Sequence, residues 1–566
     1  MVETSFINNG PMLNAYPDSM GGTLADIVRI LKKPELAHVF QSFYILPSIF
    51  NTDLDRGFSV IDYDLNRMLA DRTDLEELKQ LGIHLKLDFV LNHISVLSRQ
   101  FQDIIEHGEE SKYRNFFIDW NEFWKDHGIM TEKHYIEPDP ELIRNMFFRK
   151  PGLPILMVRF PDGKDVPYWN TFYQEIKYRE PDVQELINHL KIQYGEAVSL
   201  AAHIHQGLTN EGKIPEQLEL GALACYKKQV VEMLEASRTY LGQMDLNIKS
   251  PLVWEYYDET LKTLADYGAE IIRLDAFAYA PKEPGEKNFL NEPGTWDLLG
   301  KIQRLAEQYH LNLLPEIHSS YQEGIYAVLA EKGYMTYDFF LPGLIIDALE
   351  EMDGTILAEW ATELYTRNIR TVNMLGCHDG IPLLDLKGLI PDERIERLIE
   401  LIVERGGYVK NLHGQKNMYY QVNATYYSAL GEKDHKLLAA RALQLFMPGK
   451  PQIWYLDLFA GCNDYNAMMQ AGTGGHKEIN RTNLSSEVIE EQLQKDVVKK
   501  QIEMIRFRSS FPAFGFDSKM EIRSQNEEIC FSWVKNGYRA TLNMNLRNCE
   551  FDITGIDNKG NVIWKN

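Results

Sequence analysis

The chain has 566 residues, which is too long for one compact core, so a large domain of about 250 residues or more with insertions or a satellite domain is expected. Hydrophobic residues make up 44% and charged residues 25%, as is ordinary for a soluble globular protein. The formal net charge of -23 argues against a nucleic-acid-binding surface or an anionic-membrane surface, although local basic residues could still bind an anionic ligand.

The N-terminus and the cysteines favour a cytoplasmic protein. Residues 1–13 contain no basic segment followed by an apolar one, and the chain has no long apolar span. The five cysteines are scattered without CxxC spacing, which fits reduced thiols and neither a disulfide framework nor a zinc cluster. We therefore predict no cofactor and no metal site. For the oligomeric state, both a monomer and a homodimer stay open.

The chain begins with alternating strand and helix signals. Apolar runs predict strands at residues 12–15, 38–46 and 83–91, and helical patterns predict helices at 23–31 and 74–81. The loop after the second strand carries Asp55 and Phe58. The third strand contains Asp88 and delivers His93 at its end.

The alternation breaks between residues 94 and 244. The first part, to about residue 172, is irregular and rich in aromatic residues, and it carries Arg149 and Lys150 directly before a Pro-Gly pair. Residues 175–241 have a helix-forming composition with leucines near helical spacing, which predicts two or three helices. We predict an inserted domain over 94–244 that contains this helical insertion.

Strand and helix signals resume after the insertion. The predicted elements are strands at 270–275, 311–317, 370–375 and 451–456, with helices at 256–267 and 296–309. After residue 511, short alternating segments separated by turns predict a small antiparallel β domain.

Repeated strand–helix units with polar residues at strand ends fit two α/β architectures, a (β/α)8 barrel and a doubly wound sheet. A dinucleotide-binding sheet would need GxGxxG after its first strand, and none is found there. We predict a (β/α)8 TIM barrel with an inserted B domain, an extra helical insertion and a C-terminal β domain. The predicted boundaries are 1–93, 245–380 and 432–512 for the barrel, 94–244 for the inserted domain, 381–431 for a loop-rich subdomain and 513–566 for the C-terminal domain.

Polar residues at the predicted strand ends would meet at one face of the barrel. They are Asp88, His93, Arg273, Asp275, Glu316, His318, His378 and Asp379. Like charges in one pocket separate their pKa values, so one acid can stay ionised as a nucleophile while another holds a proton. Retaining glycosidic chemistry uses two carboxyls about 5–5.5 Å apart in this way. Arg273 could keep Asp275 ionised, or the two could form a purely structural ion pair.

Eight stretches of the sequence carry a family resemblance. They are DFVLNH (88–93), RLDAFAY (273–279), LPEIH (314–318), GCHDGI (376–381), DRGF (55–58), PGLP (151–154), YQVNATYYSAL (420–430) and EINR (478–481). Through them the chain resembles the α-amylase superfamily, glycoside hydrolase family 13. Within it, the chain looks like the sucrose phosphorylase subfamily, which includes phosphorylases for sucrose, sucrose 6-phosphate, glucosylglycerol and glucosylglycerate.

The resemblance implies a role for each matching residue. Asp275 would be the nucleophile, Glu316 the general acid and base, and Asp379 the transition-state stabiliser. The implied sugar-binding residues are Asp55, Phe58, His93, Gln243, Arg273, His378 and Arg481. The implied phosphate-binding residues are Arg149, Lys150, Tyr279, His318, Tyr420 and Gln421. Purely structural roles stay open for some of these residues. Tyr279, Tyr420 and Phe58 could be packing aromatics, and Arg149 and Lys150 could be a solvated basic pair.

The implied function is a retaining phosphorylase that converts an α-glucoside such as sucrose to α-glucose 1-phosphate, with transglucosylation as a side activity. Its partners would be a sugar and inorganic phosphate, with no nucleic acid and no membrane. One alternative is an exo-acting α-glucosidase or transglucosidase that ignores phosphate, and a remote one is a non-catalytic binding barrel. The helical insertion, Lys150 where the resemblance suggests arginine, and the stretch WYLDLFAG (454–461) leave the acceptor open.

Overall fold

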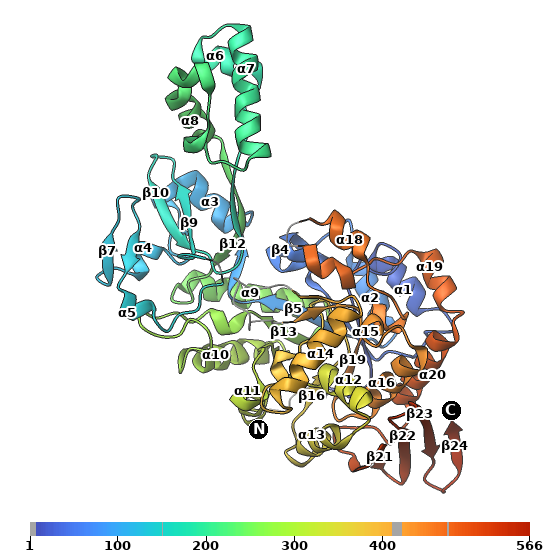
Figure 1. Ribbon diagram of the computed structural model, residues 1–566. Helices are drawn as coiled ribbons and strands as arrows, with labels where there is room; N and C mark the ends of the chain where they lie inside the picture. The colour runs from blue at the N-terminus through green and yellow to red at the C-terminus, as the bar shows by residue number, and fades with distance from the viewer. Residues whose placement is uncertain (1–6, 150, 410–420, 473–474) are drawn as a thin grey trace. The chain divides into compact units, whose positions relative to one another are not determined.

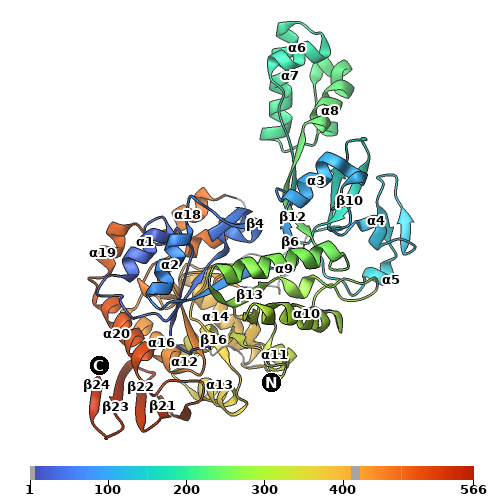
Figure 2. The same ribbon diagram turned by 180° about the vertical axis from the view of Figure 1, so that it is seen from behind.

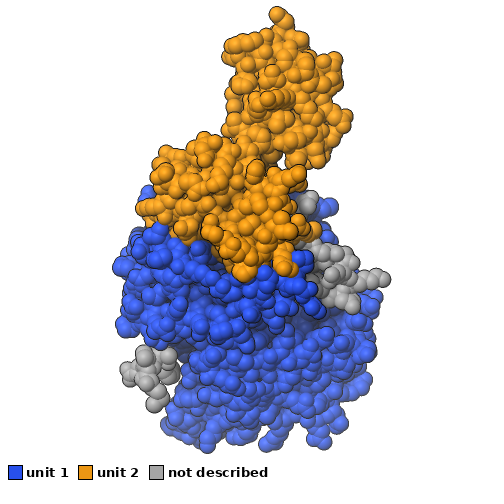
Figure 3. Space-filling model, turned by 90° about the vertical axis from the view of Figure 1, so that its left-hand side faces the viewer, with its two compact units in different colours: residues 1–92, 140–147, 246–566 blue, residues 93–139, 148–245 orange. Residues whose placement is uncertain are grey.

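The computed structural model describes residues 7–149, 151–409, 421–472 and 475–566. The chain forms two compact units (Figure 3). The first consists of residues 1–92, 140–147 and 246–566, and the second of residues 93–139 and 148–245. No described helix is both long and apolar enough to pass through a lipid bilayer.

Eight parallel strands build the core of the first unit (Figure 1). They are β1 (Met12–Ala15), β2 (Ser42–Ile45), β5 (His84–Val90), β13 (Ala269–Asp275), β14 (Asn312–Pro315), β15 (Thr336–Asp338), β16 (Thr371–Asn373) and β19 (Lys450–Trp454). Their order is β14-β13-β5-β2-β1-β19-β16-β15. Among the described strands, only the seam between β14 and β15 lacks ladder pairing, so the predicted TIM-like barrel is confirmed.

Helices between the strands cover the outside of the barrel. The main ones are α1 (Leu24–Leu31), α2 (Arg72–Gln80), α9 (Pro251–Asp266), α10 (Gly294–Gln308), α11 (Ile325–Glu331), α12 (Leu341–Glu351), α13 (Thr355–Thr366), α14 (Asp392–Glu404), α16 (Asp434–Phe446) and α20 (Asp496–Ser510). Figure 2 shows α9 and α10 side by side outside β13. Thr23 begins α1 with a reciprocal capping box to Asp26, which explains the start of this helix.

Shorter elements fill the connections of the first unit. They are β3 (Phe50–Leu54), β4 (Ser59–Leu65), α5 (Pro140–Ile143), β17 (Tyr408–Val409), β18 (Val422–Asn423), α15 (Tyr426–Ala429), α17 (Tyr455–Leu458), α18 (Tyr465–Gln470) and α19 (Ser486–Gln492). The predicted C-terminal domain is confirmed as a five-stranded antiparallel sheet. Its strands are β20 (Lys519–Gln525), β21 (Glu528–Lys535), β22 (Tyr538–Asn545), β23 (Glu550–Ile556) and β24 (Val562–Lys565).

The second unit has two parts. An aromatic core of Trp120, Trp124 and Trp169 is fully buried. The elements around it are β6 (His93–Ser95), α3 (Arg99–His107), α4 (Trp120–Phe123), β7 (Gly128–Met130), β8 (Ile136–Pro138), β9 (Ile155–Arg159) and β10 (Asp165–Trp169).

The other part is the helical insertion, which the antiparallel pair β11 (Gln174–Tyr178) and β12 (Arg238–Asp245) carries at its end. The insertion has three main helices, α6 (Val183–Leu190), α7 (Tyr194–His205) and α8 (Lys227–Ala236). They share a buried apolar cluster that includes Leu186, Leu200, Ile204, Val230 and Leu234. A common core of this kind lets the three helices pack as one subdomain.

Candidate active site

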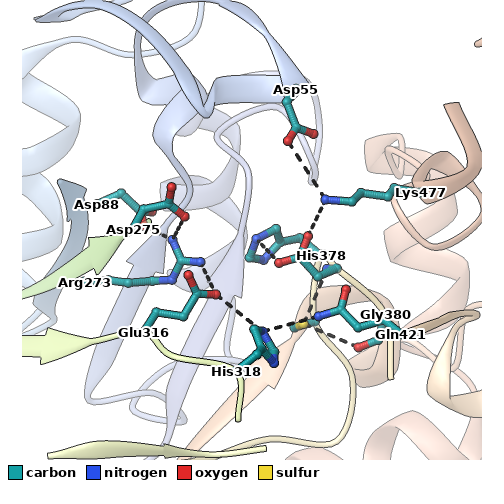
Figure 4. A network of polar contacts seen from close by, with 12 residues as sticks. Asp55, Asp88, Arg273, Asp275, Glu316, His318, His378, Gly380, Gln421 and Lys477 are labelled. Carbon is teal, nitrogen blue, oxygen red and sulfur yellow. Dashed lines mark hydrogen bonds and ion pairs between the residues drawn. The ribbon is translucent and has the colours of Figure 1, made fainter. Parts of the chain in front are cut away.

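The three predicted acids lie at the carboxyl ends of barrel strands. Asp275 is the last residue of β13, Glu316 directly follows β14, and Asp379 lies in the loop after β16. Because parallel barrel strands all end at the same face, the three side chains gather there. Figure 4 shows Asp275 and Glu316 on either side of Arg273, with Lys477 and His378 nearby. Ala276, next to Asp275, has a left-handed backbone with φ of 52°, a conformation that costs energy for a residue with a Cβ and often marks a functional site.

The Arg273 guanidinium connects two of these acids to a third carboxylate. Its Nη1 contacts Asp88 Oδ1 at 2.5 Å and Asp275 Oδ1 at 3.0 Å, and its Nη2 contacts Glu316 Oε1 at 2.5 Å. The Arg273 side chain is 3% exposed. Tyr44 donates a hydrogen bond to the other Asp88 oxygen at 2.8 Å. Arg273 is therefore the central cation of a buried cluster of carboxylates.

Burial raises the pKa of Asp275 to about 8, against the lowering effect of Arg273, and the nearby Glu316 and Asp88 add to the rise. The lowering effect of Arg273 on the pKa of Asp275 is therefore smaller than the raising effect of burial, and the one guanidinium contacts three carboxylates. The carboxylate of Glu316 on the same guanidinium therefore favours the protonated form of Asp275 in this arrangement.

Asp379 has the opposite electrostatic environment. Its carboxylate contacts His378 Nε2 at 3.1 Å, Lys477 Nζ at 2.7 Å and Arg481 Nη2 at 3.7 Å. Burial by itself raises the pKa of Asp379, but the contact with His378 and the charges of Lys477 and Arg481 hold it well below its usual range. Asp379 is therefore ionised at neutral pH, which suits a group that opposes developing positive charge.

Several predicted sugar-binding residues surround Asp379 within the first unit. Arg481 Nη1 lies 3.7 Å from Asp55 Oδ1, and Arg481 Nε donates to the His378 carbonyl oxygen at 2.8 Å. The Phe58 ring stacks on His378 with centroids 5.1 Å apart, and Arg273 lies 5.3 Å above the same ring. The structure thus brings Asp55, Phe58, Arg273, His378 and Arg481 to the acids.

The other two predicted sugar-binding residues belong to the second unit. His93 lies on β6 and Gln243 on β12, two strands that pair with each other. Both side chains are buried, and the His93 ring is 4.7 Å from Phe172.

The predicted phosphate-binding residues are divided between the first unit, the second unit and the part of the chain that is not described. Gln421 Nε2 lies 3.4 Å from His318 Nε2, and the same His318 nitrogen is 3.7 Å from Glu316 Oε1. Tyr279 is buried, with its ring 4.7 Å from Phe289. Arg149 belongs to the second unit, where its guanidinium lies 4.9 Å from the Phe172 ring centre. Lys150 and Tyr420 lie outside the described residues.

Three polar residues that support this site were not predicted. Lys477 contacts Asp379, Asp385 contacts His318, and Arg56 donates to the Arg481 carbonyl oxygen at 2.6 Å while its guanidinium lies over the Tyr16 ring. Lys477 comes one residue before EINR, and Arg56 is the second residue of DRGF. Arg56 lies inside a motif and Lys477 lies next to one. A single charged residue in a loop, however, gives no periodic pattern from which its role could be predicted.

No family model matches the chain. It is 49% identical over 556 residues to the sucrose 6(F)-phosphate phosphorylase of Ilumatobacter coccineus, covering 96% of this chain and 95% of the relative. It is 31% identical to the protein of the same name from Thermoanaerobacterium thermosaccharolyticum, covering 98% of this chain and 99% of the relative. It is 28% identical to the sucrose phosphorylase of Streptococcus mutans, covering 97% and 98%.

Solved structures agree with these relationships. The crystal structure of sucrose 6F-phosphate phosphorylase from Thermoanaerobacter thermosaccharolyticum matches with a TM-score of 0.80 at 30% identity, covering 100% of this chain and 98% of that one. An alpha-amylase from H. orenii shares the fold with a TM-score of 0.59 at 14% identity, covering 96% and 90%. From 49% and 31% identity over nearly the full length and from the shared fold, it follows that the chain belongs to the sucrose and sucrose 6F-phosphate phosphorylase subfamily of glycoside hydrolase family 13, the α-amylase superfamily.

Proposed function

We propose that this protein is a retaining phosphorylase that transfers the glucosyl group of a sucrose-type α-glucoside to inorganic phosphate and releases α-glucose 1-phosphate. The observation that supports this proposal is the arrangement of the three acids around two groups of cations. Asp275 and Glu316 contact the one guanidinium of Arg273, while Asp379 stays ionised beside Lys477 and Arg481. Double displacement needs a nucleophile, a general acid and a stabilising anion in one place.

In the first step, an Asp275 carboxylate oxygen forms a bond to the anomeric carbon while the bond from that carbon to the leaving oxygen breaks. Glu316 gives its proton to the leaving oxygen. Asp379 stabilises the positive charge that develops on the sugar ring. In the second step a phosphate oxygen attacks, the bond to Asp275 breaks, and Glu316 takes up the phosphate proton. Two inversions give net retention, so the product is the α anomer.

The favoured glucosyl donor is sucrose 6F-phosphate, because the relatives that are 49% and 31% identical carry that substrate in their names. Sucrose itself is the second candidate, supported by the relative from Streptococcus mutans. A phosphate-independent α-glucosidase or transglucosidase is the rival reaction, since the same covalent intermediate can also react with water or a sugar hydroxyl.

The proposal is tested by incubating the protein with each donor at increasing phosphate concentration and quantifying glucose 1-phosphate and free glucose. Phosphate-dependent release of α-glucose 1-phosphate, with a higher kcat/KM for sucrose 6F-phosphate than for sucrose, is expected. Release of free glucose at a rate that does not depend on phosphate would identify the hydrolase instead. Proton NMR of the first product formed reports the anomer.

Replacing Lys477 by methionine is expected to weaken the enzyme most at acidic pH. Lys477 Nζ is 2.7 Å from Asp379, so its removal raises the pKa of that carboxyl. A carboxylate with a depressed pKa loses its charge only as pH falls, so the acidic limit of kcat/KM moves upward, by about one pH unit or less because the Lys477 side chain is 28% exposed. The pH dependence of kcat/KM measures this, with Lys477→Arg as the charge-conserving control. Matching acidic limits in the methionine variant and the wild type would contradict it.

A further inference from the structure

Behind the predicted phosphate residue His318 lies a buried carboxylate, Asp385, for which the mechanism above has no role. Asp385 is in the short helical turn Leu384–Leu386. Its Oδ2 is 3.0 Å from His318 Nδ1, and the two side chains are 8% and 10% exposed. The His318 ring is also stacked on Phe339, with centroids 3.9 Å apart and planes at 22°. The stacking on Phe339 therefore fixes the plane of the His318 ring, and the contact with Asp385 fixes its rotation within that plane.

This geometry determines which imidazole nitrogen faces the acids. A carboxylate only accepts hydrogen bonds, so His318 Nδ1 carries a proton and donates a hydrogen bond to Asp385. Nε2 then points the other way, toward Glu316 Oε1 at 3.7 Å and Gln421 Nε2 at 3.4 Å. Any ligand that enters beside Glu316 meets this Nε2 edge (Figure 4).

The charges around His318 favour its protonated form. Burial by itself lowers the pKa of His318, but Asp385, Glu316 and Asp379 together raise it above its ordinary value. These three carboxylates come from three different segments of the barrel end, and the neutral side chains of Gln421 and Phe339 also contact the His318 ring. With both nitrogens protonated, His318 presents a positive charge and an N–H donor at Nε2, which is the chemistry that an incoming phosphate oxygen requires.

We propose that Asp385 is a positioning residue that holds His318 as an imidazolium with Nε2–H directed at the acceptor, and so favours phosphate over water in the second step. This inference rests on the proposed function. Water is neutral and needs only the base Glu316, whereas phosphate brings negative charge next to Glu316 and Asp379 while Asp275 is held as a neutral ester. A cation at this position selectively offsets that repulsion, so Asp385 acts on the choice of acceptor.

The test is the ratio of glucose 1-phosphate to free glucose formed at several phosphate concentrations, measured for wild type, Asp385→Asn, Asp385→Ala and a control, Asp347→Asn. Both products come from one glucosyl-enzyme, so their ratio does not depend on how much protein folds or on the rate of the first step. Asparagine keeps an acceptor for Nδ1–H but removes the charge, and alanine removes both. Asp347 is a buried carboxylate paired with Arg394 on helices α12 and α14, and it matches Asp385 in burial.

For both Asp385 variants we expect the ratio to fall about tenfold or more at neutral pH, with the larger fall in alanine, while Asp347→Asn keeps the wild-type ratio. As pH rises, the ratio should begin to decline at a lower pH in Asp385→Asn than in the wild type. The reason is that His318 loses its proton at a lower pH when Asp385 carries no charge. An unchanged ratio and pH dependence in Asp385→Asn, even with both rates reduced, would assign Asp385 a structural role and overturn the inference. If the wild type forms no glucose 1-phosphate, the proposed function itself fails, which is a separate outcome.

Discussion

Replacing Asp275 by asparagine is expected to reduce phosphorolysis and transglucosylation by about 10⁴-fold or more. An amide has no negative charge with which to attack an anomeric carbon, and losing one member of a catalytic unit costs nearly as much as losing all of it. Initial rates of glucose 1-phosphate formation, with sucrose 6F-phosphate and with sucrose, measure the loss. Turnover within about tenfold of wild type would remove Asp275 from the nucleophile role.

The same substitution should leave the fold at least as stable as the wild type. The pKa of Asp275 is raised by burial from 3.8 to about 8, so the unfolded state releases this proton at lower pH than the folded state. The wild type therefore loses stability as pH rises from about 4 to about 8, whereas asparagine does not titrate. The unfolding free energy of Asp275→Asn relative to wild type should increase across this interval. Urea unfolding at about pH 5 and about pH 8.5 measures it.

A matched control is Asp338→Asn. Asp338 is also a buried carboxylate at the end of a barrel strand, but it accepts hydrogen bonds from Leu341 N at 3.0 Å and Trp360 Nε1 at 3.1 Å. Its pKa is raised by burial to about 6. We expect this variant to keep its turnover, so that loss of a buried strand-end carboxylate is separated from loss of the nucleophile. If both variants lost activity equally, the effect of Asp275→Asn would reflect the fold of the barrel end.

The barrel could be predicted from the sequence because most of its strands have four residues or more and include adjacent apolar residues that are buried. Strand β15, Thr336–Asp338, was missed, since three residues are too few to show a period and the segment reads as a turn between helices. The strand predicted at 38–46 begins only at Ser42, because a helix-like turn occupies the preceding residues. Propensity locates an element better than it locates its ends.

The three acids could be predicted for a different reason. Each follows a buried strand, and barrel topology alone brings such residues to one face. What the sequence did not reveal was how charge is distributed among them. Arg273 is two residues from Asp275, so local reasoning pairs these two, whereas the fold places Asp88 and Glu316 on the same guanidinium. Long-range contacts of this kind depend on strand register, which is set by the packing of the whole barrel.

The Arg273 guanidinium neutralises a cluster of three carboxylates. Replacing it by methionine keeps the length and apolar character of the side chain but leaves Asp88, Asp275 and Glu316 together without a cation. Removing one partner of a buried ion pair lowers the unfolding free energy by about 3–5 kcal/mol. The pKa of Asp275 should rise further, so less of the nucleophile is ionised, and turnover should fall about 10³-fold or more.

Two further variants separate charge from geometry at Arg273. Lysine restores one positive charge but not the planar fork that reaches Asp88 and Glu316 through two nitrogens, so Arg273→Lys should recover stability more than turnover. The double variant Arg273→Met/Asp88→Asn removes one of the repelling carboxylates, and it should regain part of the lost unfolding free energy while turnover stays low. Urea unfolding and initial rates measure the two effects. If the unfolding free energy of Arg273→Met lies within about 1 kcal/mol of the wild-type value, the three carboxylates are neutralised by bound protons and not by the guanidinium.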